Sequence, residues 1–341
     1  MSYLENDCNQ QLFNCSKYIL KILVTGGLGF LGGRIAQHLL NEGHNVLVGT
    51  RNDIKLGDRF LDGARVVQTS WNDSAKLEEI CAGVDLIIHA SGMNAKDCLA
   101  DAARALDVNA VATANLLQSA IKQNVRRYLY ISSIHVYADN LQGEISEADC
   151  PANLHPYAAS HRAAENTVFW AQKNGLIDGI VVRFSNGFGV PTRRDANCWM
   201  LLINDLCRQA VEHKQLVLAS NGMQSRNFIP ISEMCSAIDF LACKLPPEHR
   251  VGQAGPINVG GQTSFSVLEM AKLIQSRCGS ILGYEPELLV REQGGCAQNP
   301  QLDYKLNRLK ALGYSHSHNP IEEIDSLLIY CHNNFRDIYE P

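Results

Sequence analysis

The 341-residue chain lacks the features that mark proteins of membranes and nucleic acids. It has no basic block, and its 30 Lys and Arg residues are outnumbered by 35 Asp and Glu residues, so binding to nucleic acid through phosphate neutralisation is not expected. The longest apolar runs, such as residues 85–90, have the length of a strand and not of a membrane span. Residues 1–17 are polar and contain no hydrophobic signal core. We therefore expect a cytoplasmic protein that contacts neither a membrane nor nucleic acid.

Metal-binding cysteine patterns are also missing. The twelve cysteines are scattered, form no C-x-x-C pair, and belong to no Cys/His cluster with zinc spacing. We expect no metal site, and we expect these cysteines to be reduced thiols that pack as small apolar side chains.

Strand-like and helix-like segments alternate through the first half of the chain. Short, continuously apolar runs predict strands at 18–24, 46–48, 65–67, 84–89, 128–132 and 179–184. Apolar residues at helical spacing predict helices at 30–41, 77–81, 100–123 and 157–173. Continuous apolar strands that alternate with helices are typical of a parallel sheet covered on both faces. The pattern predicts an α/β fold with a doubly wound parallel (Rossmann) sheet.

The rhythm changes after Asn186. Helices are expected at 199–211, 232–243 and 266–276, and short strands at 215–218, 228–231 and 256–259. We predict three parts: a polar N-terminal tail at 1–17, a dinucleotide-binding Rossmann domain at 18–185, and a smaller, mainly substrate-binding lobe at 186–341. Strands near 228–260 are expected to return to the Rossmann domain.

A glycine cluster follows the first predicted strand, in the sequence Thr25-Gly-Gly-Leu-Gly-Phe-Leu-Gly32. Glycine is needed where the backbone turns sharply and where it must approach a pyrophosphate without a Cβ in the way. The helix that follows offers free N–H groups and the positive end of its dipole to phosphates. This strand–glycine–helix context favours a dinucleotide site over a simple tight turn.

The motifs of the chain resemble those of the extended short-chain dehydrogenase/reductase family, which includes NAD(P)-dependent nucleotide-sugar epimerases and dehydratases. The matching segments occur in family order: the T-G-x-x-G-x-x-G turn, Ile88-His-Ala-Ser-Gly92, Asp107-Val-Asn109 with Asn115-Leu-Leu117, Ile131-Ser-Ser-Ile-His-Val-Tyr137, Pro156-Tyr157, Arg183-Phe-Ser-Asn-Gly-Phe-Gly189, Arg226-Asn-Phe228 and Asn258-Val-Gly-Gly261. The resemblance spans about residues 21–330. It implies the Rossmann fold and a homodimer built from the two long helices, whose many alanines permit close packing.

By this resemblance Tyr157 is the catalytic acid or base, and Ser133 hydrogen-bonds the same substrate oxygen. The family places a lysine four residues after the tyrosine, and this chain has His161 there. Three alternatives follow: His161 binds the nicotinamide ribose and, if protonated, stabilises the tyrosinate; the enzyme is slow or specialised; or the protein binds ligands without turnover. An unperturbed histidine loses its charge at about pH 6.5. An enzyme that depends on this charge should therefore lose hydride-transfer rate as the pH rises.

The segment after Ser133 bears on the reaction type. The family's 4,6-dehydratases carry an Asp-Glu pair there, whereas this chain has Ile134 and His135. Elimination of water therefore lacks its carboxylates, and dehydratase activity is not expected. His135 either transfers a proton or lines the pocket as a polar residue.

The end of the second predicted strand bears on the cofactor. NAD enzymes usually have an acidic residue there, whereas this chain has Arg51, which could pair with a 2′-phosphate. We expect NAD(P), with NADP somewhat favoured over NAD. The expected cofactor-binding residues are Gly26, Gly29, Phe30, Leu31, Gly32, Arg51, Ser70, Trp71, Ala90, Ser91, Gly92, Asn109, Tyr157 and His161.

Two further positions match family residues that bind a sugar and its diphosphate, Asn186 and Arg226. The expected substrate-binding residues are Asn94, Ser133, His135, Asn186 and Arg226. The resemblance implies an oxidoreductase or epimerase that acts on a ring carbon of a nucleotide-activated sugar, in the synthesis of surface-polysaccharide precursors. The alternatives are a reductase of another small carbonyl compound and a catalytically impaired nucleotide- or sugar-binding protein.

Overall fold

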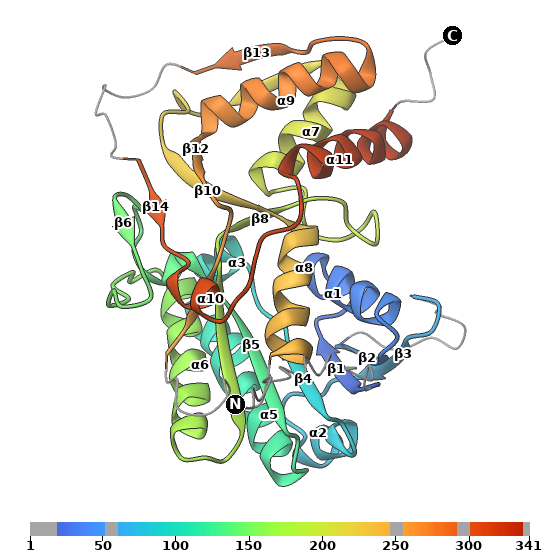
Figure 1. The fold of residues 1–341 in the computed structure, drawn as a ribbon, viewed down its shortest axis with the longest axis vertical. Helices are drawn as coiled ribbons and strands as arrows, with labels where there is room; N and C mark the ends of the chain where they lie inside the picture. Colours follow the sequence, from blue (N-terminus) through green and yellow to red (C-terminus); the bar gives the residue numbers. More distant parts are fainter. Residues whose placement is uncertain (1–18, 52–60, 246–254, 292–300, 337–341) are drawn as a thin grey trace, which may run out of the picture.

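The structure is a computed structural model that describes residues 19–51, 61–245, 255–291 and 301–336 (Figure 1). The predicted tail at 1–17 lies outside these residues. None of the described helices combines the length and the apolar character that crossing a bilayer requires. The nine cysteines within the described residues are all free thiols, and seven of the nine are buried.

A seven-stranded sheet forms the centre of the larger part of the molecule, in the order β11-β7-β5-β4-β1-β2-β3. Every pairing in it is parallel. Its strands are β1 (Lys21–Thr25), β2 (Asn45–Thr50), β3 (Arg65–Gln68), β4 (Leu86–His89), β5 (Arg127–Ser133), β7 (Asp178–Phe184) and β11 (Ile257–Val259). The strand order reverses between β1 and β4, and such switch points bind ligands at the carboxyl ends of the strands.

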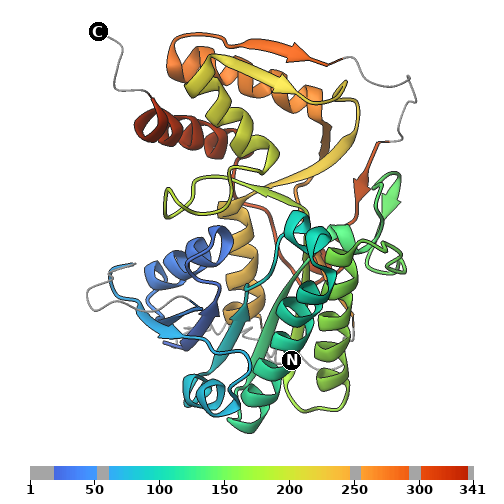
Figure 2. The same ribbon diagram turned by 180° about the vertical axis from the view of Figure 1, so that it is seen from behind.

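Helices cover both faces of this sheet. Helix α1 (Phe30–Asn41) packs against α8 (Ile231–Asp239) on one face, whereas α2 (Ser74–Cys81), α5 (Ala112–Lys122) and α6 (Pro156–Lys173) form the layer on the other (Figures 1 and 2). Neighbouring residues of β1 divide between the two cores, because Ile22 belongs to the first and Leu23 to the second. The predicted doubly wound α/β fold is confirmed.

One predicted helix is broken into several pieces. The segment expected to be helical at 100–123 begins at the last residue of α3 (Ala95–Ala100) and continues through α4 (Ala102–Ala105), the π-helix η1 (Leu106–Val111) and α5. The break falls at Asp101, whose backbone leaves the helical region and whose carboxylate accepts a hydrogen bond from the N–H of Arg104 at 2.9 Å. Asp101 thus ends one helix and caps the next.

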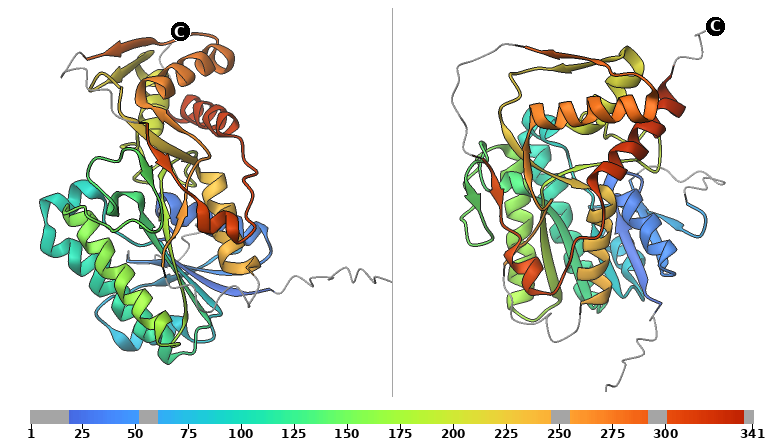
Figure 3. Two further views of the ribbon diagram at one scale, coloured as in Figure 1. Left: turned by 60° about the vertical axis from the view of Figure 1, so that its left-hand side comes forward. Right: turned by 45° about the horizontal axis from the view of Figure 1, so that its top comes forward.

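The smaller part of the molecule lies over the carboxyl ends of the sheet strands (Figure 3). Helices α7 (Leu202–His213), α9 (Val267–Leu282) and α11 (Pro320–Phe335) surround an apolar core of their own, beside the parallel pair β9 (Gln215–Leu218) and β13 (Glu287–Val290). A small sheet of β12 (Ser264–Ser266), β10 (Ser225–Pro230) and β8 (Asn186–Phe188) connects the two parts. The predicted strand at 228–231 therefore belongs to the small sheet, whereas β11 joins the large one.

The remaining elements are short. They are the 3₁₀ turn η2 (Ile134–Val136), the pair β6 (Glu144–Ile145) and β14 (Asp303–Tyr304), the π-helix η3 (Phe240–Lys244) and helix α10 (Asn307–Ala311).

Candidate active site

The glycine turn between β1 and α1 is built for a close approach of backbone to ligand. Gly26 has φ +67°, and a Cβ there would lie 2.9 Å from the backbone of Ala90 and Ser91. A Cβ on Gly32 would lie 2.4 Å from the carbonyl oxygen of Gly26. No side chain larger than glycine fits either position without displacing backbone atoms.

The start of helix α1 is left without a side-chain cap. Its N-cap is Gly29, which provides no cap hydrogen bond, and the first turn, which begins with Phe30 and Leu31, contains no acidic residue. The N–H groups of such a turn and the positive end of the helix dipole bind an anion. Five of the predicted cofactor residues, Gly26, Gly29, Phe30, Leu31 and Gly32, therefore lie together at one anion-binding helix end.

Buried polar residues brace the ends of β1 and β4 beside this turn. The Oγ1 of Thr25 lies 2.6 Å from Nδ1 of His89, and Nε2 of His89 lies 3.0 Å from Oγ1 of Thr113. The N–H of Ser91 donates to Oγ1 of Thr25 at 3.4 Å. Burial lowers the pKa of His89 to about 3, so its imidazole is neutral. This network holds the predicted Ala90–Gly92 segment in place.

Two of the predicted cofactor residues, Ser70 and Trp71, lie between β3 and α2. Trp71 stands with its ring edge toward His89, with 5.6 Å between ring centroids, and its carbonyl accepts a hydrogen bond from Asn115. Ser70 precedes it, and its carbonyl accepts the N–H of Asp73. Both residues are partly exposed at the end of β3.

Two predicted ligand-binding asparagines have their side chains engaged within the protein. Asn109 lies on the π-helix η1, accepts the N–H of Met93 at 2.8 Å and donates to Oγ of Ser160 at 2.9 Å. Asn94 caps helix α3 by accepting the N–H of Asp97 at 3.0 Å. Their side chains position the loop after β4 and helix α6, and this bracing is a role that the sequence motifs did not reveal.

Three of the four predicted catalytic residues lie together. Ser133 ends strand β5, and Tyr157 and His161 lie one turn apart on α6. The hydroxyl of Ser133 is near enough to the Tyr157 phenol to lower its pKa, but burial outweighs this effect and raises the pKa of Tyr157 above its usual value. The rings of Tyr157 and His161 are 4.4 Å apart between centroids.

His161 is neutral in this arrangement. It is buried, and burial lowers its pKa to about 4. Its Nδ1 lies 2.7 Å from the hydroxyl of Tyr130 on β5, a residue that the sequence motifs did not identify. Of the alternatives for His161, the one in which a protonated imidazole stabilises the tyrosinate is disfavoured near neutral pH, because the site desolvates the imidazole and pairs it with a neutral phenol.

The fourth predicted catalytic residue, His135, lies with the predicted substrate residues. Asn186 on β8 is near enough to His135 to favour its protonated form, and Arg226 on β10 is near enough to repel that form. Burial and Arg226 together lower the pKa of His135. Asn186 also donates to the carbonyl of Asn227 at 2.9 Å.

Arg226 differs from the two most buried arginines of the main sheet in its ion pairing within the described residues. Arg127 pairs with Asp178 at 2.7 Å, and Arg183 pairs with Glu165 through two hydrogen bonds. Within the described residues Arg226 forms no ion pair, although it is partly buried and burial lowers its pKa. A partly buried guanidinium without an acidic partner is suited to an anionic ligand.

A cavity of about 250 Å³ opens at the rim of this region. Three of its lining residues were predicted to bind ligands, namely Arg51, Gly92 and Asn94. Motif matching missed the others, Met93, Asp97, Arg104, Val108 and Asn197. The cavity places two exposed guanidinium groups, those of Arg51 and Arg104, near the loop after β4.

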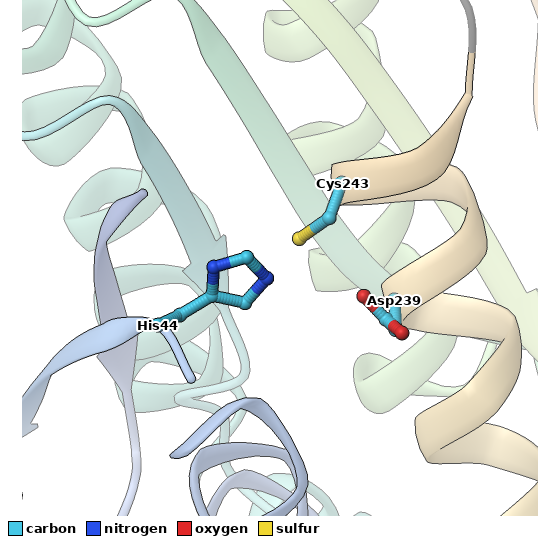
Figure 4. Close-up of side chains that lie close together, drawn as sticks. All are labelled: His44, Asp239 and Cys243. Carbon is cyan, nitrogen blue, oxygen red and sulfur yellow. The ribbon is translucent and has the colours of Figure 1, made fainter. Parts of the chain in front are cut away.

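A separate cluster lies at the amino end of β2, away from this site. Figure 4 shows His44, Asp239 and Cys243 with ligand-type atoms directed toward one another, all within 4.8 Å. The Asp239 carboxylate already pairs with Lys244 at 2.6 Å, and Nδ1 of His44 accepts the N–H of Leu20 at 3.3 Å. Burial raises the pKa of the Cys243 thiol to about 12. We interpret the cluster as a buried polar contact between β2 and α8.

The fold and the glycine turn define a Rossmann-type protein with an anion-binding helix end at its switch point. The model of the NAD dependent epimerase/dehydratase family matches residues 22–260, which is well over half of the chain. The chain belongs to this family.

Individual relatives share about a quarter or less of their residues with this chain. The chain is 26% identical over 305 residues to a low-salt glycan biosynthesis protein of Haloferax volcanii, covering 86% of this chain and 93% of that protein. It is 27% identical over 272 residues to an uncharacterized UDP-glucose epimerase of Bacillus subtilis, covering 76% and 83%, respectively. A UDP-glucuronic acid 4-epimerase of Bacillus cereus, solved with UDP-glucuronic acid and NAD, superposes with a TM-score of 0.75 at 21% identity, covering 92% and 99% of the two chains. This last likeness supports the fold.

Proposed function

We propose that this protein is an NAD(P)-dependent enzyme that moves a hydride at a ring carbon of a nucleotide-activated sugar, as an oxidoreductase or epimerase. One observation carries the proposal: Ser133 at the end of β5 lies close enough to Tyr157 on the first turn of α6 for its hydroxyl to lower the pKa of the phenol, at the same carboxyl edge of the sheet where the glycine turn follows β1. The membership of the family supports it.

The residues at the start of α1 fit a dinucleotide. The uncapped first turn and the two glycines that exclude a Cβ leave backbone N–H groups accessible to a pyrophosphate. Bound NAD would accept a hydride from the sugar carbon and return it to the oxidised sugar. The family description names NAD, and the Bacillus cereus neighbour was solved with NAD, so neither supports the NADP preference that Arg51 implies.

Tyr157 and Ser133 would carry the proton transfer. As the sugar C–H bond breaks and its C–O bond becomes C=O, the phenolate oxygen of deprotonated Tyr157 would take the hydroxyl proton. Ser133 would donate a hydrogen bond to the same sugar oxygen and hold it in line with Tyr157. Tyr157 would return the proton to this oxygen when the C=O bond becomes C–O again, and reduction on the opposite face of the ring would give the epimer.

The residues after Ser133 favour this reaction over dehydration. Elimination of water needs an acid and a base beside the sugar. Ile134 is fully buried in the apolar core, and His135 is the single titratable side chain of the turn η2. We assign His135 to substrate contact or proton transfer.

The substrate side of the cleft supports a nucleoside diphosphate. Arg226 has no acidic partner among the described residues and lies near His135 and Asn186. A planar guanidinium binds a diphosphate through paired hydrogen bonds. The sugar ring would lie toward Ser133 and Tyr157. We also propose that the chain divides at residue 185 into a cofactor-binding domain and a mainly substrate-binding lobe.

A second candidate function rests on His161. The family motif has a lysine at this position, and its cation would lower the pKa of Tyr157; a neutral histidine does not supply that charge. This observation favours either a slow enzyme or a protein that binds a nucleotide sugar without turnover. A reductase of another small carbonyl compound would use the same Ser133–Tyr157 pair.

The deciding experiment incubates the pure protein with NAD or NADP and a panel of nucleotide sugars. Reduced cofactor is followed by absorbance, and new sugars are followed by NMR. We expect one sugar to be epimerised or oxidised. Comparison of the rates with NAD and with NADP identifies the preferred cofactor. A 4-keto-6-deoxy product would overturn the assignment against dehydration. Tight binding of cofactor and sugar with no product from any of them would establish the binding protein instead.

Three broader assignments belong to the same proposal. We propose a homodimer, because apolar side chains are exposed on the layer formed by α3, η1 and α6, namely Leu99, Leu106, Val111 and Trp170.

We propose a role in surface-polysaccharide precursor synthesis, which the name of the Haloferax volcanii relative supports. We also propose a cytoplasmic location, which the free thiols support.

A further inference from the structure

We propose that Tyr130 is a positioning residue for His161: its hydroxyl donates a hydrogen bond to Nδ1 and so fixes a neutral imidazole with its proton on Nε2. The connection of this pair to catalysis rests on the proposed function. The tautomer and its cause are properties of the protein alone.

The geometry joins two elements of the main fold. Tyr130 lies on β5, three residues before Ser133, and His161 lies on α6, one turn after Tyr157. The hydroxyl–Nδ1 distance is 2.7 Å, and both side chains are buried. The bond therefore fixes the imidazole from the side of the sheet, while the ring of Tyr157 packs against it at 4.4 Å.

The direction of the bond follows from the protonation states. Burial raises the pKa of Tyr130 well above its usual value, so the phenol keeps its proton, and burial keeps His161 neutral. Within the described residues the Tyr130 hydroxyl makes no other hydrogen bond. If it accepted a proton from Nδ1, its own proton would be buried without an acceptor, which is costly. Tyr130 is therefore the donor, and the imidazole proton lies on Nε2.

The imidazole of His161 lies beside Gly92 in the loop after β4, near the proposed cofactor site. Cε1 of His161, the atom bonded to both ring nitrogens, lies 4.0 Å from where a Cβ on Gly92 would sit. Gly92 lines the cavity beside the loop after β4. Nε2–H makes no hydrogen bond within the described residues, so a donor of fixed direction remains for a ligand oxygen. By holding the imidazole proton on Nε2, Tyr130 makes His161 a neutral hydrogen-bond donor.

Other titratable groups surround the pair. They are His89 on β4, Cys98 on α3, Tyr128 on β5, and Tyr157 and Glu165 on α6. Glu165 is held by Arg183, and His89 is neutral. None of these groups supplies a positive charge that would reverse the protonation state of His161.

The first test reads the tautomer directly. The full-length protein is labelled with ¹⁵N-histidine, and the long-range ¹H–¹⁵N spectrum is recorded at neutral pH, with His161→Gln used to assign the signals. We expect protonated Nε2 and unprotonated Nδ1 for His161, and a changed Nδ1 shift or a tautomer mixture in Tyr130→Phe. A protonated Nδ1, an imidazolium, or a spectrum unchanged by Tyr130→Phe would overturn the proposal. This result does not depend on whether any sugar is turned over.

The chain offers a matched control. Tyr128 lies two residues earlier on the same strand and is equally buried, but its hydroxyl has no hydrogen-bond partner within the described residues. Tyr130→Phe should lower kcat about fivefold with little change in KM for the sugar, whereas Tyr128→Phe should leave kcat nearly unchanged. In the His161→Gln background Tyr130→Phe should cost less than about twofold. An equal loss from both phenylalanine variants, or the same loss with and without His161, would overturn the positioning role.

Discussion

Asn109 and Ser160 form a 2.9 Å hydrogen bond that joins the π-helix η1 to the helix of Tyr157. Ser160 in turn donates to the carbonyl of Tyr157, and the other end of the Asn109 amide accepts the N–H of Met93. A single buried amide therefore connects the loop after β4, which borders the cofactor side, with the first turn of α6. Such π-turns often occur at functional sites because the wider turn redirects one side chain.

The pH dependence of the reaction tests the charge state of this site. Because His161 has a pKa of about 4 and the pKa of Tyr157 is raised, His161 is already neutral, and the tyrosinate fraction grows as the pH rises. The rate of sugar oxidation should therefore rise across the neutral range, with no decline at about 6.5, the ordinary histidine pKa. Steady-state rates measured under saturating substrate at constant ionic strength check this.

The matching variant is His161→Lys. A lysine ammonium beside Tyr157 would stabilise the tyrosinate, so the rising limb should move to lower pH and the rate at neutral pH should increase. Tyr157→Phe should abolish proton transfer and leave cofactor binding nearly intact. If wild-type activity instead falls as the pH rises through about 6.5 and His161→Lys removes that fall, His161 works as a cation in the liganded enzyme.

The substrate side can be tested through Arg226. Its guanidinium has no acidic partner among the described residues, so Arg226→Met should weaken binding of uridine diphosphate by at least about tenfold. Calorimetry with uridine diphosphate alone measures this, and NADH titration should remain within about twofold because the glycine turn is untouched. Arg65→Met is the control, since Arg65 is exposed at the amino end of β3. Equal loss of both ligands would indicate a structural role for Arg226.

Much of the main sheet could be predicted from the sequence, because each strand is a continuous apolar run and each helix carries one apolar face. The helix predicted at 30–41 and the strand at 215–218 have the observed bounds. Helix α11 was missed, although Ile324, Leu327, Leu328 and Cys331 are spaced for one buried face. Strands β8 and β12 have three residues each, too few for a period to be read.

The site was predictable where a motif names a residue and unpredictable where long-range packing sets its state. Ser133 and Tyr157 come together as expected. The neutral charge of His161 depends on its burial, and its Nδ1 contact depends on Tyr130 of another element; no local pattern encodes either. Asn109 matches a motif, but its hydrogen bonds to Met93 and Ser160 are contacts between distant segments.

The proposed dimer depends on exposed apolar side chains of α3, η1 and α6. Figure 2 shows this helical layer facing the viewer. Leu106 and Trp170 are 47% and 61% exposed and lie on the same helical layer as the exposed Leu99 and Val111, and exposed apolar side chains gathered on one face are typical of an interaction surface. We expect twice the 37.6 kDa chain mass by light scattering at micromolar concentration, and a shift toward the monomer in Leu106→Glu and Trp170→Glu. Ile329→Glu on α11, at a residue 49% exposed, should not change the mass. A wild-type monomer would refute the dimer.

The buried ion pair of Arg183 and Glu165 links β7 to α6, and removing one partner should destabilise that side of the sheet. Both side chains are almost fully buried, the two hydrogen bonds measure 2.8 and 2.5 Å, and the guanidinium lies 4.5 Å from the Tyr137 ring centroid. Arg183→Met would leave the Glu165 charge buried without its partner and should lower the free energy of unfolding by about 3–5 kcal/mol in urea denaturation.

Two further variants separate this pair energy from a general effect of losing an arginine. Arg193→Met removes an exposed pair with Asp195 and should cost no more than about 1 kcal/mol. The double variant Arg183→Met/Glu165→Leu removes both buried charges and should recover most of the loss, because the penalty arises from the uncompensated carboxylate. If the double variant is as unstable as Arg183→Met alone, the lost stability comes from the packing of Arg183 against Tyr137. The uncompensated charge of Glu165 is then not its cause.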